Sequence, residues 1–194
     1  MDERVRLYFW NAEEAEEYPP TEEILSKFPA FYAERYRSAK IEPVRQGAVG
    51  SAWLLADHLG VTSEEQLSRG EHGAVALRDG SHFLSLSHCG PVTVLAVSDV
   101  PVGVDLETAD TVPEATVRRF FPPSFQKRMA DAAPEERLPV FLECWTQLEA
   151  AVKADGRGLT APRGSFEELL SRYELRTEWV DGRCLSIAVK KEHT

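Results

Sequence analysis

The chain contains two short stretches in which charged residues interrupt an otherwise apolar pattern. A strand-like run beginning at Val102 ends with two acids two residues apart, Asp105 and Glu107. A helix-like run ending at Lys153 carries Glu149 four residues earlier. Carboxylates beside a hydrophobic core need a counter-charge, and three that converge favour a divalent metal ion. Any fold of this chain must therefore bury the apolar residues of these stretches and still give the acids a counter-charge or solvent.

The acids of the first stretch are predicted to share one face of a strand. Residues two apart on a strand point the same way, so Asp105 and Glu107 lie on one side while Val104 and Leu106 point into the core. Gly103 permits a close backbone approach or a bulge just before the acids. An edge strand with a solvated acidic face would show the same pattern.

The second stretch is typical of a helix with one partly buried stripe. Trp145, Glu149 and Lys153 are spaced four residues apart, so they follow one side of the helix. A tryptophan anchored against the core would bring Glu149 toward the interior. The alternative is a surface ion pair between Glu149 and Lys153, worth about 0.3–0.5 kcal/mol.

Composition narrows the class of protein. The 194 residues carry 32 acids against 22 Lys and Arg, a net charge of −10, which argues against bulk attraction to nucleic acid or an anionic membrane. We find no apolar run near the ~18 residues of a membrane-spanning helix and no signal-peptide pattern at the N-terminus. Cys89, Cys144 and Cys184 are widely spaced, so we expect reduced thiols in a cytoplasmic protein.

The pattern of predicted elements indicates an α+β fold with two similar halves, residues 1–99 and 100–194, the second carrying the acids. Strands are predicted from alternating or apolar runs at residues 4–10, 75–77, 83–87, 92–98, 102–107, 173–180 and 184–189. Helices are predicted at residues 21–27, 31–39, 45–59, 113–121 and 138–154. A polar, proline-punctuated segment extends to Pro134, and Asp181-Gly182 predicts a hairpin turn.

Ser87 and His88 follow an alternating strand and precede a Cys-Gly-Pro turn. A histidine at such a strand end can donate to a phosphate, or it can be an ordinary loop residue. A catalytic Ser–His pair is disfavoured, because adjacent strand residues point to opposite faces and no Gly-x-Ser-x-Gly elbow surrounds them.

Taken together, these motifs resemble the Sfp-type 4′-phosphopantetheinyl transferases. The resemblance covers roughly residues 35–166 and rests on four motifs in the family order. They are Ser87-His88, the 102–107 strand, the Trp145…Glu149…Lys153 helix and the Gly-Arg-Gly-Leu turn at 156–159.

The resemblance implies two α+β halves related by a pseudo-twofold axis. It also implies transfer of 4′-phosphopantetheine from coenzyme A to a serine of an acyl or peptidyl carrier protein. Asp105, Glu107 and Glu149 are similar to the family's Mg²⁺ ligands, with Glu149 also catalytic. Lys153 resembles the lysine near the pyrophosphate, which can help deprotonate the serine. Ser87-His88 resembles the pair whose histidine contacts a coenzyme A phosphate.

The sequence departs from the family pattern at two places. Leu148 stands where the family helix commonly carries a lysine, which removes a contact to phosphate or carrier. Residues 71–74 replace the usual Gly-Lys-Pro loop. Arg35, Arg37, Lys40 and Arg45 are candidates for holding the 3′-phosphate of coenzyme A, and a solvated basic helix face is their alternative.

Three functions fit these features. The first is a monomeric, Mg²⁺-dependent transferase whose partners are coenzyme A and a carrier protein, with no nucleic acid and no membrane. The second is a degenerate family member that binds coenzyme A or a carrier without efficient transfer. The third is a metal-dependent phosphodiesterase, which would release phosphopantetheine without a carrier.

Overall fold

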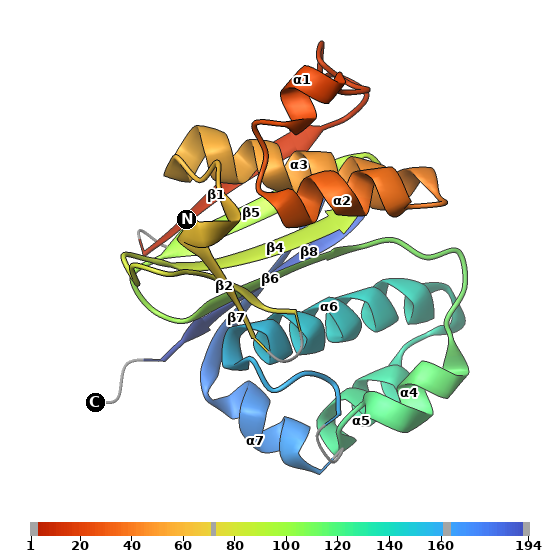
Figure 1. The fold of residues 1–194 in the computed structure, drawn as a ribbon. Coiled ribbons are helices and arrows are strands. Elements are labelled where there is room, and N and C mark those ends of the chain that lie inside the picture. The colour runs from red at the N-terminus through yellow and green to blue at the C-terminus, as the bar shows by residue number, and fades with distance from the viewer. Residues whose placement is uncertain (1–3, 71–72, 161–163, 192–194) are drawn as a thin grey trace. The chain divides into compact units, whose positions relative to one another are not determined.

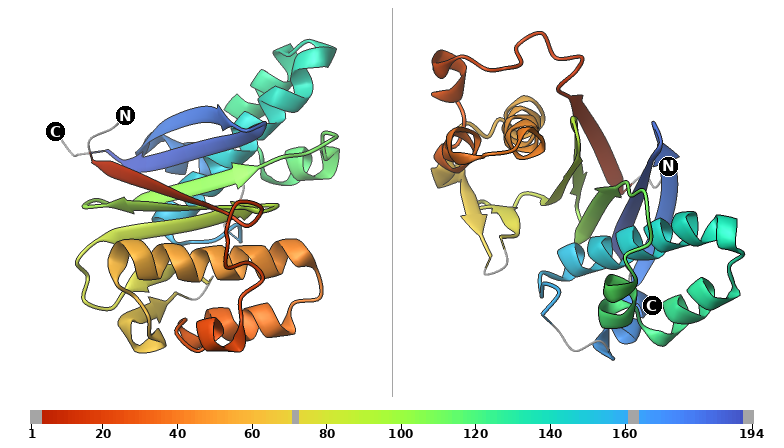
Figure 2. Two further views of the ribbon diagram at one scale, coloured as in Figure 1. Left: turned by 90° about the horizontal axis from the view of Figure 1, so that it is seen from above. Right: turned by 90° about the vertical axis from the view of Figure 1, so that its right-hand side faces the viewer.

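The computed structural model describes residues 4–70, 73–160 and 164–191 and divides the chain into two compact units, Met1–Asp99 and Val100–Thr194. Each unit contains a three-stranded antiparallel sheet with its longest helix packed on it (Figures 1 and 2). The expected mixed α/β architecture is therefore confirmed, whereas the pseudo-twofold relation stays a prediction. Glu71 and His72, which belong to the loop expected to differ from the family pattern, lie outside the described residues.

The first unit is built around a sheet with the strand order β1-β5-β4. Its strands are β1 (Val5–Asn11), β4 (Phe83–Cys89) and β5 (Val92–Ser98), and a separate small sheet pairs β2 (Leu67–Arg69) with β3 (Val75–Leu77). Its helices are α1 (Glu22–Leu25), α2 (Ala30–Ser38), α3 (Glu42–Leu59) and a 3₁₀ turn, η1 (Glu64–Gln66).

Helix α3 packs directly on this sheet because it carries small residues where it meets the strands. A Cβ atom on Gly50 would lie 2.5 Å from the Trp10 ring and 2.7 Å from Cβ of Thr93. The helix ends at Gly60, whose φ of 65° provides the left-handed cap expected of glycine there. The predicted helix at 45–59 is thus confirmed, with a start three residues earlier.

The second unit has the strand order β6-β8-β7, with both pairs antiparallel. Its strands are β6 (Val102–Glu107), β7 (Tyr173–Val180) and β8 (Arg183–Lys190). Its helices are α4 (Glu114–Phe120), α5 (Pro123–Asp131), η2 (Pro134–Glu136), α6 (Arg137–Asp155) and α7 (Ser165–Ser171). The predicted β7–β8 hairpin is confirmed, with positive φ at both Asp181 (48°) and Gly182 (75°).

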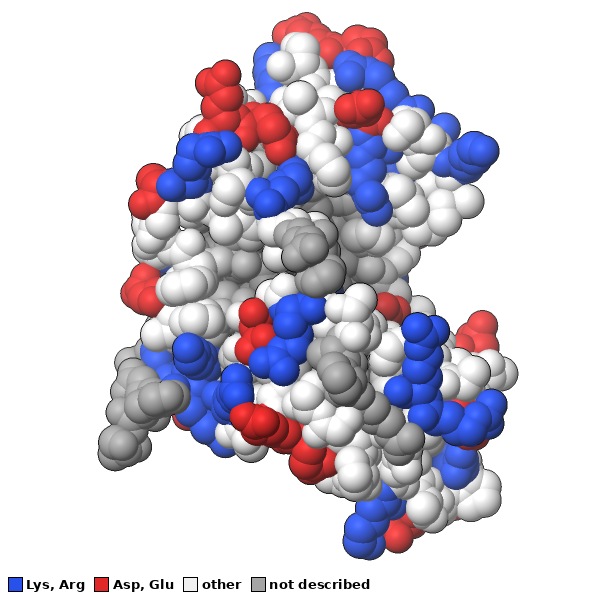
Figure 3. Space-filling view, turned by 60° about the horizontal axis from the view of Figure 1, so that its bottom comes forward, with Lys and Arg blue, Asp and Glu red and all other residues white. Residues whose placement is uncertain are grey.

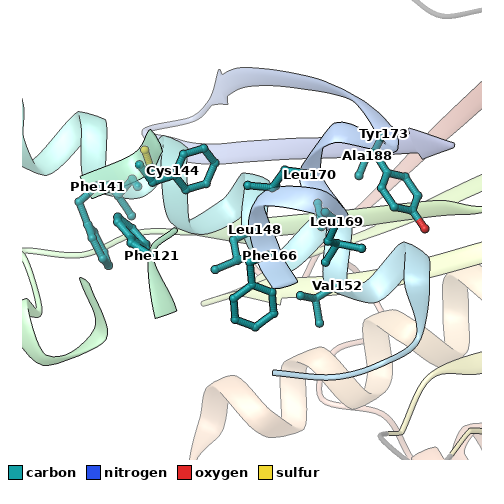
Figure 4. Packing of buried hydrophobic residues seen from close by; sticks show 14 of the residues in the cluster. Phe121, Phe141, Cys144, Leu148, Val152, Phe166, Leu169, Leu170, Tyr173 and Ala188 are labelled. Atoms are coloured by element: carbon teal, nitrogen blue, oxygen red, sulfur yellow. The ribbon is translucent and has the colours of Figure 1, made fainter. Parts of the chain in front are cut away.

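The hydrophobic core of the second unit surrounds α6. Leu148 is fully buried in a cluster that also contains Phe166, Val152 and stacked rings of Phe121 and Phe141 (Figure 4). The side chain at position 148 therefore belongs to the core. A phosphate or carrier contact from this position is not available to the folded chain.

The structure adds one helix to the sequence-based expectation and extends one strand. The segment before Pro134 contains α5, which begins at Pro123 because proline is tolerated in the first helical turn. Phe125 and Met129, one turn apart, bury its inner side. Strand β4 continues through Cys89, so His88 lies within the strand and pairs with Thr93.

Cys89, Cys144 and Cys184 are all buried, as expected of core thiols. In the described part of the chain, no helix combines the length and the apolar character needed to cross a bilayer. Figure 3 shows basic and acidic side chains interspersed over the described surface in view.

Candidate functional site

Strand β6 carries Asp105 and Glu107 toward α6. Asp105 is only 3% exposed, and Val104 and Leu106 are fully buried on the opposite face. Although β6 is an edge strand of its sheet, its acidic face is covered by the helix. The alternative of a solvated acidic face is therefore wrong for Asp105.

Gly103 makes the close approach of β6 to α6 possible. A Cβ atom at this position would lie 2.7 Å from the backbone nitrogen of Ala154 and 2.9 Å from the carbonyl carbon of Ala150, and closer still to the Ala150 oxygen. The ladder to β8 continues without a bulge through Gly103, which pairs with Ala188. Close approach, one of the two roles expected of this glycine, is confirmed.

Lys153 connects the helix to the strand. Its Nζ donates to Oδ1 of Asp105 at 2.7 Å and to the carbonyl oxygen of Val104 at 3.1 Å. The Asp105 side chain is almost fully buried and the Lys153 side chain about one-third exposed, so this ion pair is screened from water on one side. The ammonium therefore bridges α6 and the backbone of β6.

Glu149 lies one turn before Lys153 and is half-buried. Trp145, a further turn back, packs against the core beside the rings of Phe120 and Phe141, with centroids 5.8 and 6.4 Å away. The predicted tryptophan anchor is thus present, on the same side of α6 as Glu149.

Burial and the repulsion between neighbouring carboxylates raise the pKa values of Glu107 and Glu149. Burial raises the pKa of Glu107 to about 7, with the negative charges of Asp105 and Glu149 adding to the shift and Lys153 opposing it. Burial likewise raises the pKa of Glu149 to about 7, again with Asp105 adding and Lys153 opposing. The four groups therefore act on one another electrostatically.

The donor chemistry of this cluster fits a hard divalent cation. Three carboxylates from one strand and one helix offer oxygen donors of the type that such a cation prefers. Burial disfavours the charged forms of Glu107 and Glu149, so a cation beside them would be stabilising. As arranged, no three His, Cys, Asp or Glu side chains within the described residues stand close enough to hold an ion.

A chain of hydroxyl groups next to Asp105 was not foreseen from the sequence. Thr146 Oγ1 and Ser186 Oγ are 2.7 Å apart, Ser186 Oγ is 2.7 Å from Thr177 Oγ1, and Gln147 Nε2 donates to Thr177 at 2.8 Å. Ser186 is the cross-strand neighbour of Asp105. Each residue is ordinary by itself, and only the register of β6, β7 and β8 brings them together.

The remaining candidate residues lie in the first unit. Ser87 is buried, and His88 packs its ring on α3, where a Cβ atom on Gly47 would lie 2.8 Å from His88 Nε2. As adjacent strand residues, Ser87 and His88 point to opposite faces of β4.

The basic residues of α2 and α3 have partners of their own. Arg45 donates through Nε to the carbonyl oxygen of Ala39 at 3.1 Å, and its guanidinium lies 6.0 Å from the Tyr36 ring centre. Arg37 pairs with Glu22 at 2.6 Å, and Lys40 is exposed. Arg45 is thus oriented by the backbone between the two helices, whereas Arg37 belongs to a surface ion pair.

Comparison with known proteins finds a family match within the second unit. Residues 101–179 match the model of the 4′-phosphopantetheinyl transferase superfamily, a span that contains Asp105, Glu107, Glu149 and Lys153.

Curated relatives extend this similarity. The chain is 34% identical over 90 residues to the 4′-phosphopantetheinyl transferase psf-1 of Bacillus pumilus, covering 46% of this chain and 38% of the relative. It is 27% identical over 106 residues to the 4′-phosphopantetheinyl transferase Sfp of Bacillus subtilis (strain 168), covering 54% and 47%. With the 4′-phosphopantetheinyl transferase ffp of Bacillus subtilis, identity is 28% over 131 residues, covering 66% and 54%.

The matched part spans about half the length of these relatives. The family match and the relatives nevertheless agree on one group of proteins, the one that the four motifs resemble. Residues 101–179 are therefore similar to the 4′-phosphopantetheinyl transferase superfamily.

Proposed function

We propose that this protein transfers 4′-phosphopantetheine from coenzyme A to a serine of an acyl or peptidyl carrier protein. The observation that carries the proposal is the partly buried cluster of Asp105, Glu149 and Lys153 between β6 and α6, within the segment that matches the family. The relatives are named 4′-phosphopantetheinyl transferases, which supports the same reaction.

The proposal includes a magnesium ion held by Asp105, Glu107 and Glu149. Oxygen donors are the ligands that Mg²⁺ prefers, and water molecules commonly complete its octahedron. A bound Mg²⁺ would neutralise the charge of the coenzyme A pyrophosphate and of the transition state.

In this reaction the serine oxygen bonds to the β-phosphorus of coenzyme A, and the bond from that phosphorus to the leaving adenosine 3′,5′-bisphosphate breaks. Glu149 is the first candidate to accept the serine proton as general base. Lys153 supplies positive charge for the pyrophosphate and is the second candidate for the proton. Positioning and electrostatics account for most of what such a site provides.

Four residues of the first unit are proposed to bind coenzyme A. His88 and Ser87 contact a phosphate, and Lys40 and Arg45 contact the 3′-phosphate. Two features support the assignment. The His88 ring is fixed against α3 at Gly47, and the Arg45 guanidinium is oriented by the Ala39 carbonyl, so neither side chain must be ordered when the ligand binds.

A mass-shift assay tests the proposal. The protein is incubated with coenzyme A, Mg²⁺ and a panel of fatty-acid, polyketide and nonribosomal-peptide carriers, and each carrier is weighed by mass spectrometry. We expect at least one carrier to gain the mass of phosphopantetheine, and a carrier with its acceptor serine replaced by alanine to gain none. If the folded protein modifies no carrier in the panel, the proposed transfer is wrong for these classes.

A further inference from the structure

Lys153 places a positive charge directly against the acid cluster. Its Nζ lies 2.7 Å from Oδ1 of Asp105, the most deeply buried of the three carboxylates. A second bond, 3.1 Å to the Val104 carbonyl oxygen, holds the ammonium on the backbone of β6. The lysine is thus fixed at one carboxylate by two acceptors of the same strand.

The charge of Lys153 acts on the whole cluster. It lowers the pKa of both Glu107 and Glu149 against the effect of burial, and the ammonium is bonded directly to Asp105. A surface pair such as Lys127–Asp131, with both side chains more than 60% exposed, contributes little by comparison. Removing one member of a largely buried pair leaves a buried charge without its counter-ion, which is costly.

A divalent ion bound to Asp105 and the ammonium of Lys153 repel each other strongly at this distance. The repulsion favours departure of the ammonium from Asp105 Oδ1 when the metal binds. Lys153 is on a long flexible side chain that is about one-third exposed, so it can move toward solvent without any change in α6.

We propose that Lys153 is a built-in counter-ion that competes with the divalent metal for Asp105. Without metal it holds β6 and α6 together by neutralising the cluster. When metal binds, the ammonium leaves Asp105 and becomes available to an incoming anion such as a pyrophosphate. This inference rests on the metal site of the proposed function and adds a coupling between metal binding and lysine release.

The first test replaces Lys153 by methionine, which keeps the length of the side chain and removes its charge. At about pH 8, we expect Lys153→Met to bind Mg²⁺ and Mn²⁺ at least about tenfold more tightly than the wild type by calorimetry, a difference of about 1.4 kcal/mol. In EDTA the variant should unfold at a lower urea concentration, and Mg²⁺ should restore its midpoint to at least the wild-type value. Equal or weaker metal binding by the variant would overturn the competition.

Lys127→Met is the matched control. It also removes a lysine bonded to an aspartate, at 2.5 Å, but on the exposed side of α5. We expect it to leave both the metal affinity and the metal dependence of the urea midpoint unchanged. If it shifts the metal affinity as much as Lys153→Met does, the effect reflects net charge and the local competition is wrong.

The second test needs no variant and remains decisive if Lys153→Met fails to fold. The wild-type protein is labelled with an amine-reactive reagent, and the labelling rate of each lysine is measured by mass spectrometry with and without Mg²⁺. We expect Mg²⁺ to increase the rate at Lys153 several-fold and to leave Lys127 unchanged. An unchanged or slower rate at Lys153 would show that metal does not release it.

These outcomes are separable from the proposed function. Transfer to a carrier without tighter metal binding by Lys153→Met refutes the competition and leaves the transferase intact. Mg²⁺-driven release of Lys153 without transfer to any carrier supports the competition and refutes the transferase. If neither the wild type nor the variant binds Mg²⁺ or Mn²⁺, the competition is wrong.

Discussion

Gly103→Ala tests whether the contact between β6 and α6 builds the site. The added Cβ would meet the carbonyl group of Ala150 and, at 2.7 Å, the nitrogen of Ala154. These are the acceptor and donor positions of one turn of α6, and backbone atoms cannot rotate away as a flexible side chain could. Strand and helix would have to separate by roughly 1 Å.

We expect this separation to cost about 3 kcal/mol, the upper part of the range for overpacked cores. For a chain of this length the loss corresponds to a fall in Tm of about 6–12 °C. Because Asp105 lies on the strand, and Glu149 and Lys153 lie on the helix, a shift of this size should also reduce kcat/KM for carrier modification about 100-fold. Thermal unfolding followed by circular dichroism and the carrier mass-shift assay measure the two effects.

Gly164→Ala is the control for the same chemical change. Gly164 has helical φ and ψ of −62° and −22°, and a Cβ atom there would have no neighbour within 4 Å. We expect Gly164→Ala to change the free energy of unfolding by less than about 1 kcal/mol and to leave carrier modification unaffected. If Gly103→Ala is as stable and as active as Gly164→Ala, the reasoning that Gly103 sets the strand–helix distance is wrong.

Three further predictions concern the same helix and cluster. Leu148→Lys, which introduces the residue common in the family, should lower the free energy of unfolding in urea by about 4 kcal/mol, because it buries an ammonium in the core. The control Leu148→Met should lower it by less than about 1.5 kcal/mol. Glu149→Gln should abolish carrier modification in the mass-shift assay and keep the native circular dichroism spectrum; full activity would remove Glu149 from the site. In EDTA, the free energy of unfolding should fall as pH rises from about 5 to about 8. The reason is that the pKa values of Glu107 and Glu149 in the folded protein, about 7, exceed those in the unfolded chain, so the folded protein binds more protons over this range. A rise in stability with pH would contradict the burial of these acids.

Much of the secondary structure around the candidate site could be predicted, because it follows from local periodicity. The alternation in β6 and the four-residue spacing in α6 gave both elements with bounds within one residue of those observed. The turn at Asp181-Gly182 was predictable for a different reason, since few residue pairs accept two positive φ angles. Helix α5 was not predicted, because the sequence there indicated only a polar, proline-punctuated segment to Pro134.

The candidate site itself was predictable only as a set of residue types. The sequence by itself determined that three acids and a lysine lie on a strand face and a helix side, because periodicity decides which side chains share a face.

Only the tertiary structure decided what these residues contact. It gave Lys153 a partner 48 residues earlier, Asp105, and assigned Leu148 to the core. It also aligned Ser186 and Thr146 beside Asp105. These outcomes depend on the distance between β6 and α6 and on the register of β8. Long-range packing determines this distance and this register. A local sequence pattern does not indicate which distant backbone segment will lie against Gly103.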